Sequence, residues 1–134
     1  MITLVDSNVL LDIATQDPQW SRWSEKALID AADSGQLAIN PIIYAEVSVG
    51  FATLEELNDA LPAETFIRFQ LPYLAGFLAG QAFVAYQRRG GAELAPLPDF
   101  YIGAHAAVSG YRLLTRDGNR YRRYFPTVTI VAPF

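Results

Sequence analysis

Four acidic residues stand out because each is the lone carboxylate in a stretch that is otherwise apolar or turn-forming. They are Asp6, Glu46, Asp99 and Asp117. In an open α/β fold, strand ends and helix starts converge on one edge of the sheet, so we expect these side chains to meet there. Carboxylates gathered in this way repel one another unless a cation lies between them. Oxygen ligands favour Mg²⁺ or Mn²⁺, and the pattern indicates metal-assisted hydrolysis of a phosphodiester bond.

Asp6 and Glu46 both have a structural alternative to metal binding. Asp6 could cap the helix that follows the first strand, but Ser7 or Asn8 could do this instead, which leaves the carboxylate for a ligand role. Glu46 could lie on the exposed stripe of its helix. Its neighbours in residues 42–47 are mostly apolar, however, and a buried glutamate is rare unless it is paired or bound to a cation.

The alternatives for Asp99 and Asp117 carry more weight. Asp99 precedes an apolar helical stretch and could be an ordinary N-cap, a role that is compatible with binding a cation. Asp117 stands in Thr115-Arg116-Asp117-Gly118, which could be no more than a turn. A turn alone would leave the neighbouring arginines unexplained.

The composition excludes several other chemistries. A chain of 134 residues, 51% of them hydrophobic, is typical of one domain, which we place at residues 1–134. With no cysteine and one histidine, it can form no disulfide, thiolate zinc site or His-rich metal centre. The absence of cysteine also suits a reducing cytoplasm. His105 falls inside a predicted helix, where we expect it to pack or hydrogen-bond.

Two features bear on localisation. The chain opens without the basic segment of a signal peptide. Residues 69–87 carry no charge, but their proline, glycines and glutamines argue against a membrane span and favour a buried helix. We therefore expect a cytoplasmic protein that does not associate with membranes.

The elements that must position the acids are short apolar strands alternating with helices. Strands are expected at 2–5, 37–39, 65–69, 112–115 and 127–131. Helices are expected at 9–14, 20–32, 41–49, 53–61, 71–89 and 99–109, with a loop at 92–98. Asn40-Pro41 is a strong helix start, because it joins an N-cap residue to a proline at the first helical position. The alternation predicts an α/β fold with a parallel sheet covered on both faces.

Taken in order, these motifs resemble a PIN domain, and they look most like the VapC-type toxins of bacterial toxin–antitoxin pairs. The resemblance covers essentially the whole chain. It rests on Asp6-Ser7-Asn8-Val9-Leu10-Leu11-Asp12, Glu46 after Asn40-Pro41-Ile42, Pro98-Asp99 leading a helix, Leu114-Thr115-Arg116-Asp117, Arg120-Tyr121-Arg122 and Tyr124-Phe125-Pro126. Any single piece is weak, whereas the ordered set is specific.

The resemblance implies a three-layer α/β/α sandwich around a five-stranded parallel sheet in the order 3-2-1-4-5. It implies a Mg²⁺- or Mn²⁺-dependent endoribonuclease, a homodimer, and inhibition by a cognate antitoxin whose C-terminal segment covers the active-site groove. The four acids named above would form the metal-binding cluster. Asn8 and Thr115 would be supporting groups that orient the carboxylates or a water. For Asp12, one helical turn past Asn8, we expect a helix-face residue rather than a ligand.

RNA binding is expected to depend on the C-terminal part of the chain, because the net charge of −4 is unusual for a nucleic-acid-binding protein. Five of the ten basic residues fall between Arg112 and Arg123. Arg116, Arg120 and Arg122 would hold phosphates bidentately, unless they form only a solvated surface.

Several alternatives remain open at this point. A PIN-like module that has lost catalysis and only binds RNA or protein is the main rival to the nuclease. Trp20, Trp23 and Phe51 could be ordinary core residues or could line an apolar groove for an antitoxin helix. A dehalogenase-like phosphatase is excluded because it needs a second aspartate where Asn8 stands. The RNA target, the number of metal ions and the antitoxin's identity are not encoded in these motifs.

Overall fold

The computed structural model describes residues 1–91 and 97–134 of the chain. The strands are β1 (Ile2–Val5), β2 (Gln36–Ile39), β3 (Phe66–Arg68), β4 (Arg112–Leu114) and β5 (Ile130–Val131). The helices are α1 (Ser7–Ala14), α2 (Ser21–Ser34), α3 (Pro41–Ser48), α4 (Leu54–Ala60), α5 (Tyr73–Arg88), α6 (Leu97–Ser109) and α7 (Gly118–Tyr124). The strands and helices alternate largely as predicted.

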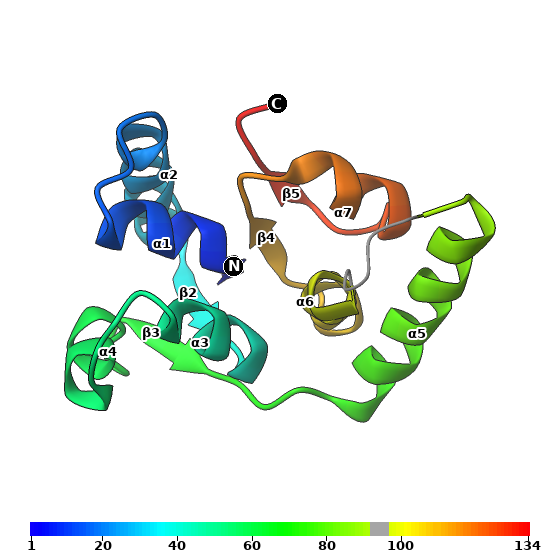
Figure 1. Ribbon diagram of the computed structural model, residues 1–134, viewed down its shortest axis with the longest axis horizontal. Helices are drawn as coiled ribbons and strands as arrows, with labels where there is room; N and C mark the ends of the chain where they lie inside the picture. The colour runs from blue at the N-terminus through cyan, green and yellow to red at the C-terminus, as the bar shows by residue number, and fades with distance from the viewer. Residues whose placement is uncertain (92–96) are drawn as a thin grey trace.

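The five strands form one parallel sheet in the order β3-β2-β1-β4-β5, which confirms the predicted fold class. The central strand β1 pairs Thr3 with Leu37 of β2 on one side and with Arg112 of β4 on the other. The chain passes from β1 to β2 and β3 in one direction across the sheet, and then returns to β4 and β5 on the other side of β1. Because connections between parallel strands are right-handed, this reversal places α1 and α2 on one face of the sheet and α5, α6 and α7 on the other. Figure 1 shows this division of the helices.

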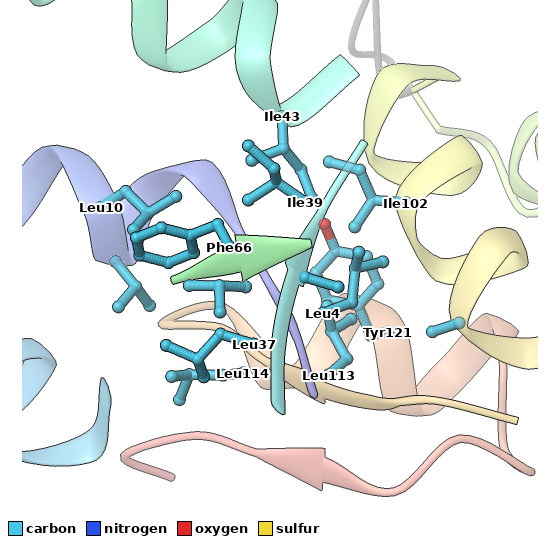
Figure 2. Close-up of a cluster of buried hydrophobic side chains, with 14 of the residues drawn as sticks. Leu4, Leu10, Leu37, Ile39, Ile43, Phe66, Ile102, Leu113, Leu114 and Tyr121 are labelled. Carbon is cyan, nitrogen blue, oxygen red and sulfur yellow. The ribbon is translucent and has the colours of Figure 1, made fainter. Parts of the chain in front are cut away.

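Both faces of the sheet are buried, as a parallel sheet requires. In Figure 2, Leu37 and Leu114 point toward the side of Leu10, whereas Leu4 and Leu113 point toward the side of Tyr121. All six side chains are buried. Neighbouring residues of one strand therefore pack into opposite halves of the core. Because the strands are parallel, the polar residues that follow them lie at the same edge of the sheet.

The structure corrects the predicted boundaries in two places. Asp6 itself caps α1, which begins at Ser7, so neither Ser7 nor Asn8 is the cap. Asp99 is the third residue of α6 rather than its N-cap, since the helix already includes Leu97 and Pro98. The rest of the predicted loop, residues 92–96, lies outside the described residues.

A further correction concerns α7, which was not predicted at all. Its sequence, Gly118-Asn119-Arg120-Tyr121-Arg122-Arg123-Tyr124, has no apolar periodicity beyond two tyrosines. Tyr121 is buried against the sheet, and this tertiary packing outweighs weak local propensity. Across the described residues, the helices are each too short or too polar to cross a bilayer.

His105 is a core residue, as predicted. Its ring is buried and contacts those of Phe69 and Tyr111 edge-on. The Asn40 side chain caps α3 by accepting from the Ile43 backbone N–H at 2.9 Å, and its Nδ2 lies 3.0 Å from His105 Nδ1. Because the Asn40 oxygen is an acceptor, Nδ2 donates and Nδ1 of the histidine accepts. Burial lowers the pKa of His105, which keeps the imidazole neutral.

We predict that Asn40→Ala lowers the free energy of unfolding by about 2–4 kcal/mol, because it removes a helix cap and leaves a buried imidazole nitrogen without a donor. Urea denaturation at neutral pH measures this change. Thr53→Ala is the matched control, since Thr53 caps α4 through the Glu56 N–H from an exposed position. Equal losses in the two variants would show that the bond to His105 contributes nothing.

Candidate active site

The Asp6 carboxylate lies at the carboxyl end of β1 and is 3% exposed. Its Oδ2 accepts from the Thr115 hydroxyl at 2.7 Å, the Tyr121 hydroxyl at 3.1 Å and Asn8 Nδ2 at 3.4 Å. Its Oδ1 accepts from the Ser7 backbone N–H at 2.8 Å. These donors come from the start of α1, the end of β4 and α7, so three segments converge on one carboxylate.

Glu46 reaches the same place from α3. It is partly buried, and its Oε1 accepts from the Ser7 hydroxyl at 2.9 Å. The same hydroxyl lies 3.5 Å from Asp6 Oδ1, so Ser7 stands between the two carboxylates. Glu46 is therefore not part of an exposed polar stripe, and the structure places it where the sequence predicted.

Asp99 joins this pair from the first turn of α6. Its Oδ2 accepts from Arg120 Nη1 at 2.6 Å. Its negative charge also raises the pKa values of both Asp6 and Glu46, which shows that the three acids lie within electrostatic reach of one another. We refer to Asp6, Glu46 and Asp99 as the acidic triad.

The pKa values of Asp6 and Glu46 are raised mainly by burial. Burial raises the pKa of Asp6 from 3.8 to about 6, against the opposing effect of the Thr115 hydrogen bond. Burial likewise raises the pKa of Glu46. The Tyr121 phenol has its pKa raised by burial and by the charges of the triad, so it stays protonated and acts as a donor to Asp6.

Asp117 is less closely integrated than the other three acids. It is exposed and precedes α7 without a capping hydrogen bond from its side chain. Its backbone N–H donates to the Thr115 hydroxyl at 3.1 Å, and the same hydroxyl donates to Asp6. Its side chain lines a cavity of about 440 Å³ together with Asn8, Trp20 and Arg116. Asp117 is thus connected to the triad through its backbone N–H and the Thr115 hydroxyl.

The predicted supporting residues both contact Asp6. Thr115 is buried, and its hydroxyl makes the shortest hydrogen bond to that carboxylate. The Asn8 amide donates to Asp6, and its Oδ1 accepts from the Arg116 backbone N–H at 3.1 Å. Asn8 therefore joins the start of α1 to the loop between β4 and α7.

The three arginines predicted to bind RNA each have a partner within the protein. Arg116 makes two hydrogen bonds to the Asp12 carboxylate, Arg120 binds Asp99, and Arg122 donates to the carbonyl oxygen of Phe134. Of the three, Arg120 is the one that contacts the triad. Phosphate binding by these side chains remains a prediction.

The roles of two residues in this site, Tyr121 and Ser7, were not predicted. Tyr121 was not predicted to donate a hydrogen bond to Asp6, because α7 was not predicted. It is this helix that directs the Tyr121 hydroxyl toward the Asp6 carboxylate. Ser7 was interpreted as a helix cap, whereas its hydroxyl bridges Asp6 and Glu46. The serine directly after Asp6 was the available clue.

The donor chemistry of the triad fits a hard divalent cation, because the groups that it offers are carboxylate oxygens. Burial, and to a lesser degree the charge of Asp99, raises the pKa of Asp6, so a cation beside it would favour its ionised form. Within residues 1–91 and 97–134, no three His, Asp or Glu side chains stand close enough together to hold a metal ion as they are now placed. The Arg120 guanidinium meanwhile offsets the charge of Asp99.

Comparisons with known proteins identify the family and the fold of the chain. The family model of the PIN domain matches residues 3–126. No curated protein sequence matches the chain. Among solved structures, VapBC2 from Rickettsia felis bound to a promoter DNA fragment is similar with a TM-score of 0.74 and 18% identity, over 98% of both chains.

Two further solved structures show the same fold. VapBC-1 from nontypeable Haemophilus influenzae gives a TM-score of 0.73 at 16% identity, and a toxin–antitoxin complex from Klebsiella pneumoniae gives 0.66 at 24% identity. Each comparison covers 98% of both chains. At these identities the likeness is one of fold.

We predict that the ionised Asp6 carboxylate destabilises the metal-free protein. Its folded pKa of about 6 lies above the ordinary value of 3.8, so the folded state holds the proton more tightly over this range. The free energy of unfolding, relative to that of Asp6→Asn, should therefore fall by up to about 3 kcal/mol as the pH rises from about 4 to above 6.

The measurement is urea denaturation of both proteins in EDTA at a series of pH values. Asp6→Asn has no titrating group at this position, and it controls for the opposite effect of His105. Addition of Mn²⁺ at pH 7.5 should stabilise the wild type more than the variant. Parallel pH profiles for the two proteins would contradict the assignment of a raised pKa to Asp6.

Proposed function

The chain belongs to the PIN-domain family, and we propose that it is a Mg²⁺- or Mn²⁺-dependent endoribonuclease that acts as the toxin of a toxin–antitoxin pair. Family membership supports a nuclease. The observation that carries the proposal for this chain is that Asp6 and Glu46 lie on either side of the Ser7 hydroxyl at the carboxyl end of β1, with Asp99 within electrostatic reach of both.

In this proposal the triad, with Asp117 beside it, would hold the divalent cation. Such a cation activates a water for attack at phosphorus and offsets the charge that develops on the phosphate. The chain's own polar groups set the direction of the Asp6 carboxylate. Thr115 and Tyr121 engage Oδ2, while the Ser7 backbone engages Oδ1 and its hydroxyl engages Glu46.

Arg120 is the best placed of the predicted RNA-binding residues, because it already contacts the triad through Asp99. A guanidinium at this position can pair with either a carboxylate or a phosphate. If Asp99 held a cation instead, the Arg120 guanidinium would be available to a phosphate of the RNA. We propose this exchange as the role of Arg120 in substrate binding.

We also propose that residues 1–134 form a single PIN domain. The family match spans residues 3–126. The sheet takes β1 from the start of the chain and β5 from residues 130–131. The last strand pairs with β4, which carries Thr115 at its end, so the C-terminal segment belongs to the same folded unit as the site.

A cognate antitoxin is the proposed protein partner. Apolar side chains of α1, α2, β3 and the segment between α3 and α4 line a cavity of about 500 Å³, and they include Leu10, Ile13, Leu28, Ile29, Phe66 and Phe51. Such a surface fits the apolar face of an amphipathic helix. Phe51 faces this cavity, whereas Trp20 packs edge-on against Trp23 and Phe134. The solved VapBC structures named above support a partner of this kind.

A homodimer is proposed from the exposed apolar face of α5. Tyr73 is 100% exposed, Phe77 is 63% exposed, and Leu74 and Val84 are exposed on the same helix. Large apolar side chains gathered on one surface helix mark an interaction site. A self-complementary face of this kind suits a symmetric pair of identical chains.

We predict that Asp6→Asn, Glu46→Gln and Asp99→Asn each reduce RNA cleavage by about 100-fold or more, because each removes a charged ligand of the cation. Asp117→Asn should reduce it less, by about tenfold, since the Asp117 side chain is exposed and the residue is joined to the triad through its backbone N–H. The assay is cleavage of a small-RNA pool by purified protein with Mg²⁺, with Mn²⁺ and with EDTA.

Asp30→Asn is the control for loss of an acid, because Asp30 lies in an exposed ion pair with Lys26 on α2. Cleavage that persists in EDTA, or that survives Asp6→Asn, would contradict a metal-dependent mechanism. A folded wild-type protein that cleaves none of the pool but retains RNA would instead fit the non-catalytic binding module.

We predict that Phe77→Glu converts the dimer into a monomer, because a charge at a site that is 63% exposed is tolerated by the folded chain but not by an apolar interface. Light scattering coupled to gel filtration measures the mass. Glu55→Gln, on the exposed side of α4, controls for a change of charge. A monomeric wild type, or a dimeric variant, would rule out α5 as the interface.

A further inference from the structure

Asp12 and Arg116 form an ion pair beneath the proposed site. Both guanidinium contacts are short: Arg116 Nε lies 2.8 Å from Asp12 Oδ2, and Nη2 lies 3.0 Å from Oδ1. The Asp12 carboxylate is buried, and Oδ2 also accepts from the Ser24 hydroxyl at 2.8 Å. Residues on α1 and α2 are thereby joined to the loop that follows β4.

Arg116 is held by contacts besides this pair. Its backbone N–H donates to Asn8 Oδ1 at 3.1 Å, and its guanidinium carbon lies 5.3 Å from the centre of the Trp20 ring. The contacts therefore fix both the backbone and the side chain of this residue. Arg116 stands between Thr115 and Asp117, so whatever fixes Arg116 also fixes the residues on either side of it.

The geometry argues against the phosphate-binding role predicted from the sequence. If Arg116 turned to a phosphate in solvent, it would leave the buried Asp12 carboxylate with only the neutral Ser24 hydroxyl as a donor among the contacts described. Breaking one side of a buried ion pair is costly, because a charge is left in a poorly solvated place. A solvated phosphate offers no comparable compensation.

We propose that Asp12 and Arg116 are positioning residues for the metal site of the nuclease proposed above, on which this inference rests. Their ion pair holds the loop after β4 against α1. In that arrangement the Thr115 hydroxyl reaches Asp6 and the Asn8 amide lies between Asp6 and Arg116. Neither Asp12 nor Arg116 contacts the RNA.

Asp12→Asn separates the two roles, because they predict different effects on RNA affinity and on Mn²⁺ affinity. If Arg116 bound phosphate, release from Asp12 would leave its charge available and RNA affinity would rise. If the pair positions the metal site, Mn²⁺ affinity and kcat should each fall by about tenfold or more, with RNA affinity in EDTA unchanged. Calorimetric titration with Mn²⁺ and RNA binding at several salt concentrations provide the readouts.

Arg116→Lys is the second variant, since it keeps the charge but cannot reproduce the two-pronged contact with Asp12. It should also weaken Mn²⁺ binding while the salt dependence of RNA binding stays as in the wild type. Asp30→Asn, which breaks an exposed Lys26–Asp30 pair, is the matched control and should change neither quantity.

The inference is overturned if both variants bind Mn²⁺ within twofold of the wild type, or if Arg116→Lys weakens RNA binding at unchanged kcat. The titration separates it from the proposed function. A wild type that binds Mn²⁺ but cleaves no RNA contradicts the nuclease alone, and the variants still decide the positioning role. A wild type that binds no Mn²⁺ overturns both.

Discussion

The Asp6 carboxylate ends the central strand of a sheet that is buried on both faces, and a charge at that position must be satisfied by the protein around it. The backbone and hydroxyl of Ser7 and the side chains of Asn8, Thr115 and Tyr121 supply the donors. These groups come from α1, the end of β4 and α7. The need to hydrogen-bond the buried Asp6 carboxylate thus brings these three segments together at the carboxyl edge of the sheet.

The same requirement explains why the ionised Asp6 carboxylate is unfavourable in the protein without a cation. Hydrogen bonds stabilise the ionised Asp6 carboxylate, yet burial outweighs them, and the nearby Asp99 raises its pKa further. Arg120 offsets part of this charge by pairing with Asp99. A fold that keeps such an arrangement gives up stability in order to hold carboxylates close together, which is a common cost of function.

Much of the architecture could be predicted from the sequence. The Asn40-Pro41 start of α3 depends only on local chemistry, and Asn40 caps the helix as expected. The position of Asp6 at the carboxyl edge of the sheet, with Glu46 and Asp99 on the helices α3 and α6, is the arrangement expected of a parallel sheet, whereas their joint binding of a cation stays a prediction. The order of the strands was implied by resemblance to PIN domains rather than by any residue pattern, and the observed sheet has that order.

What could not be predicted depends on contacts between distant segments. The Arg116–Asp12 pair joins residues 104 positions apart, and no local signal distinguishes an arginine that binds a buried acid from one that faces solvent. Helix α7 lacks apolar periodicity, and only the packing of Tyr121 beside Asp6 identifies it. Asp117 matched a motif, but its exposure depends on how the loop before α7 is held.

The central claim is that Asp6, Glu46 and Asp99 form one divalent-cation site. Anomalous diffraction from crystals grown with Mn²⁺ tests it most directly, because the manganese signal locates the ion without reference to activity. The account predicts a manganese peak at the carboxyl end of β1, with oxygens of Asp6 and at least one other member of the triad as ligands. Manganese bound elsewhere, with these three carboxylates uncoordinated, would contradict it.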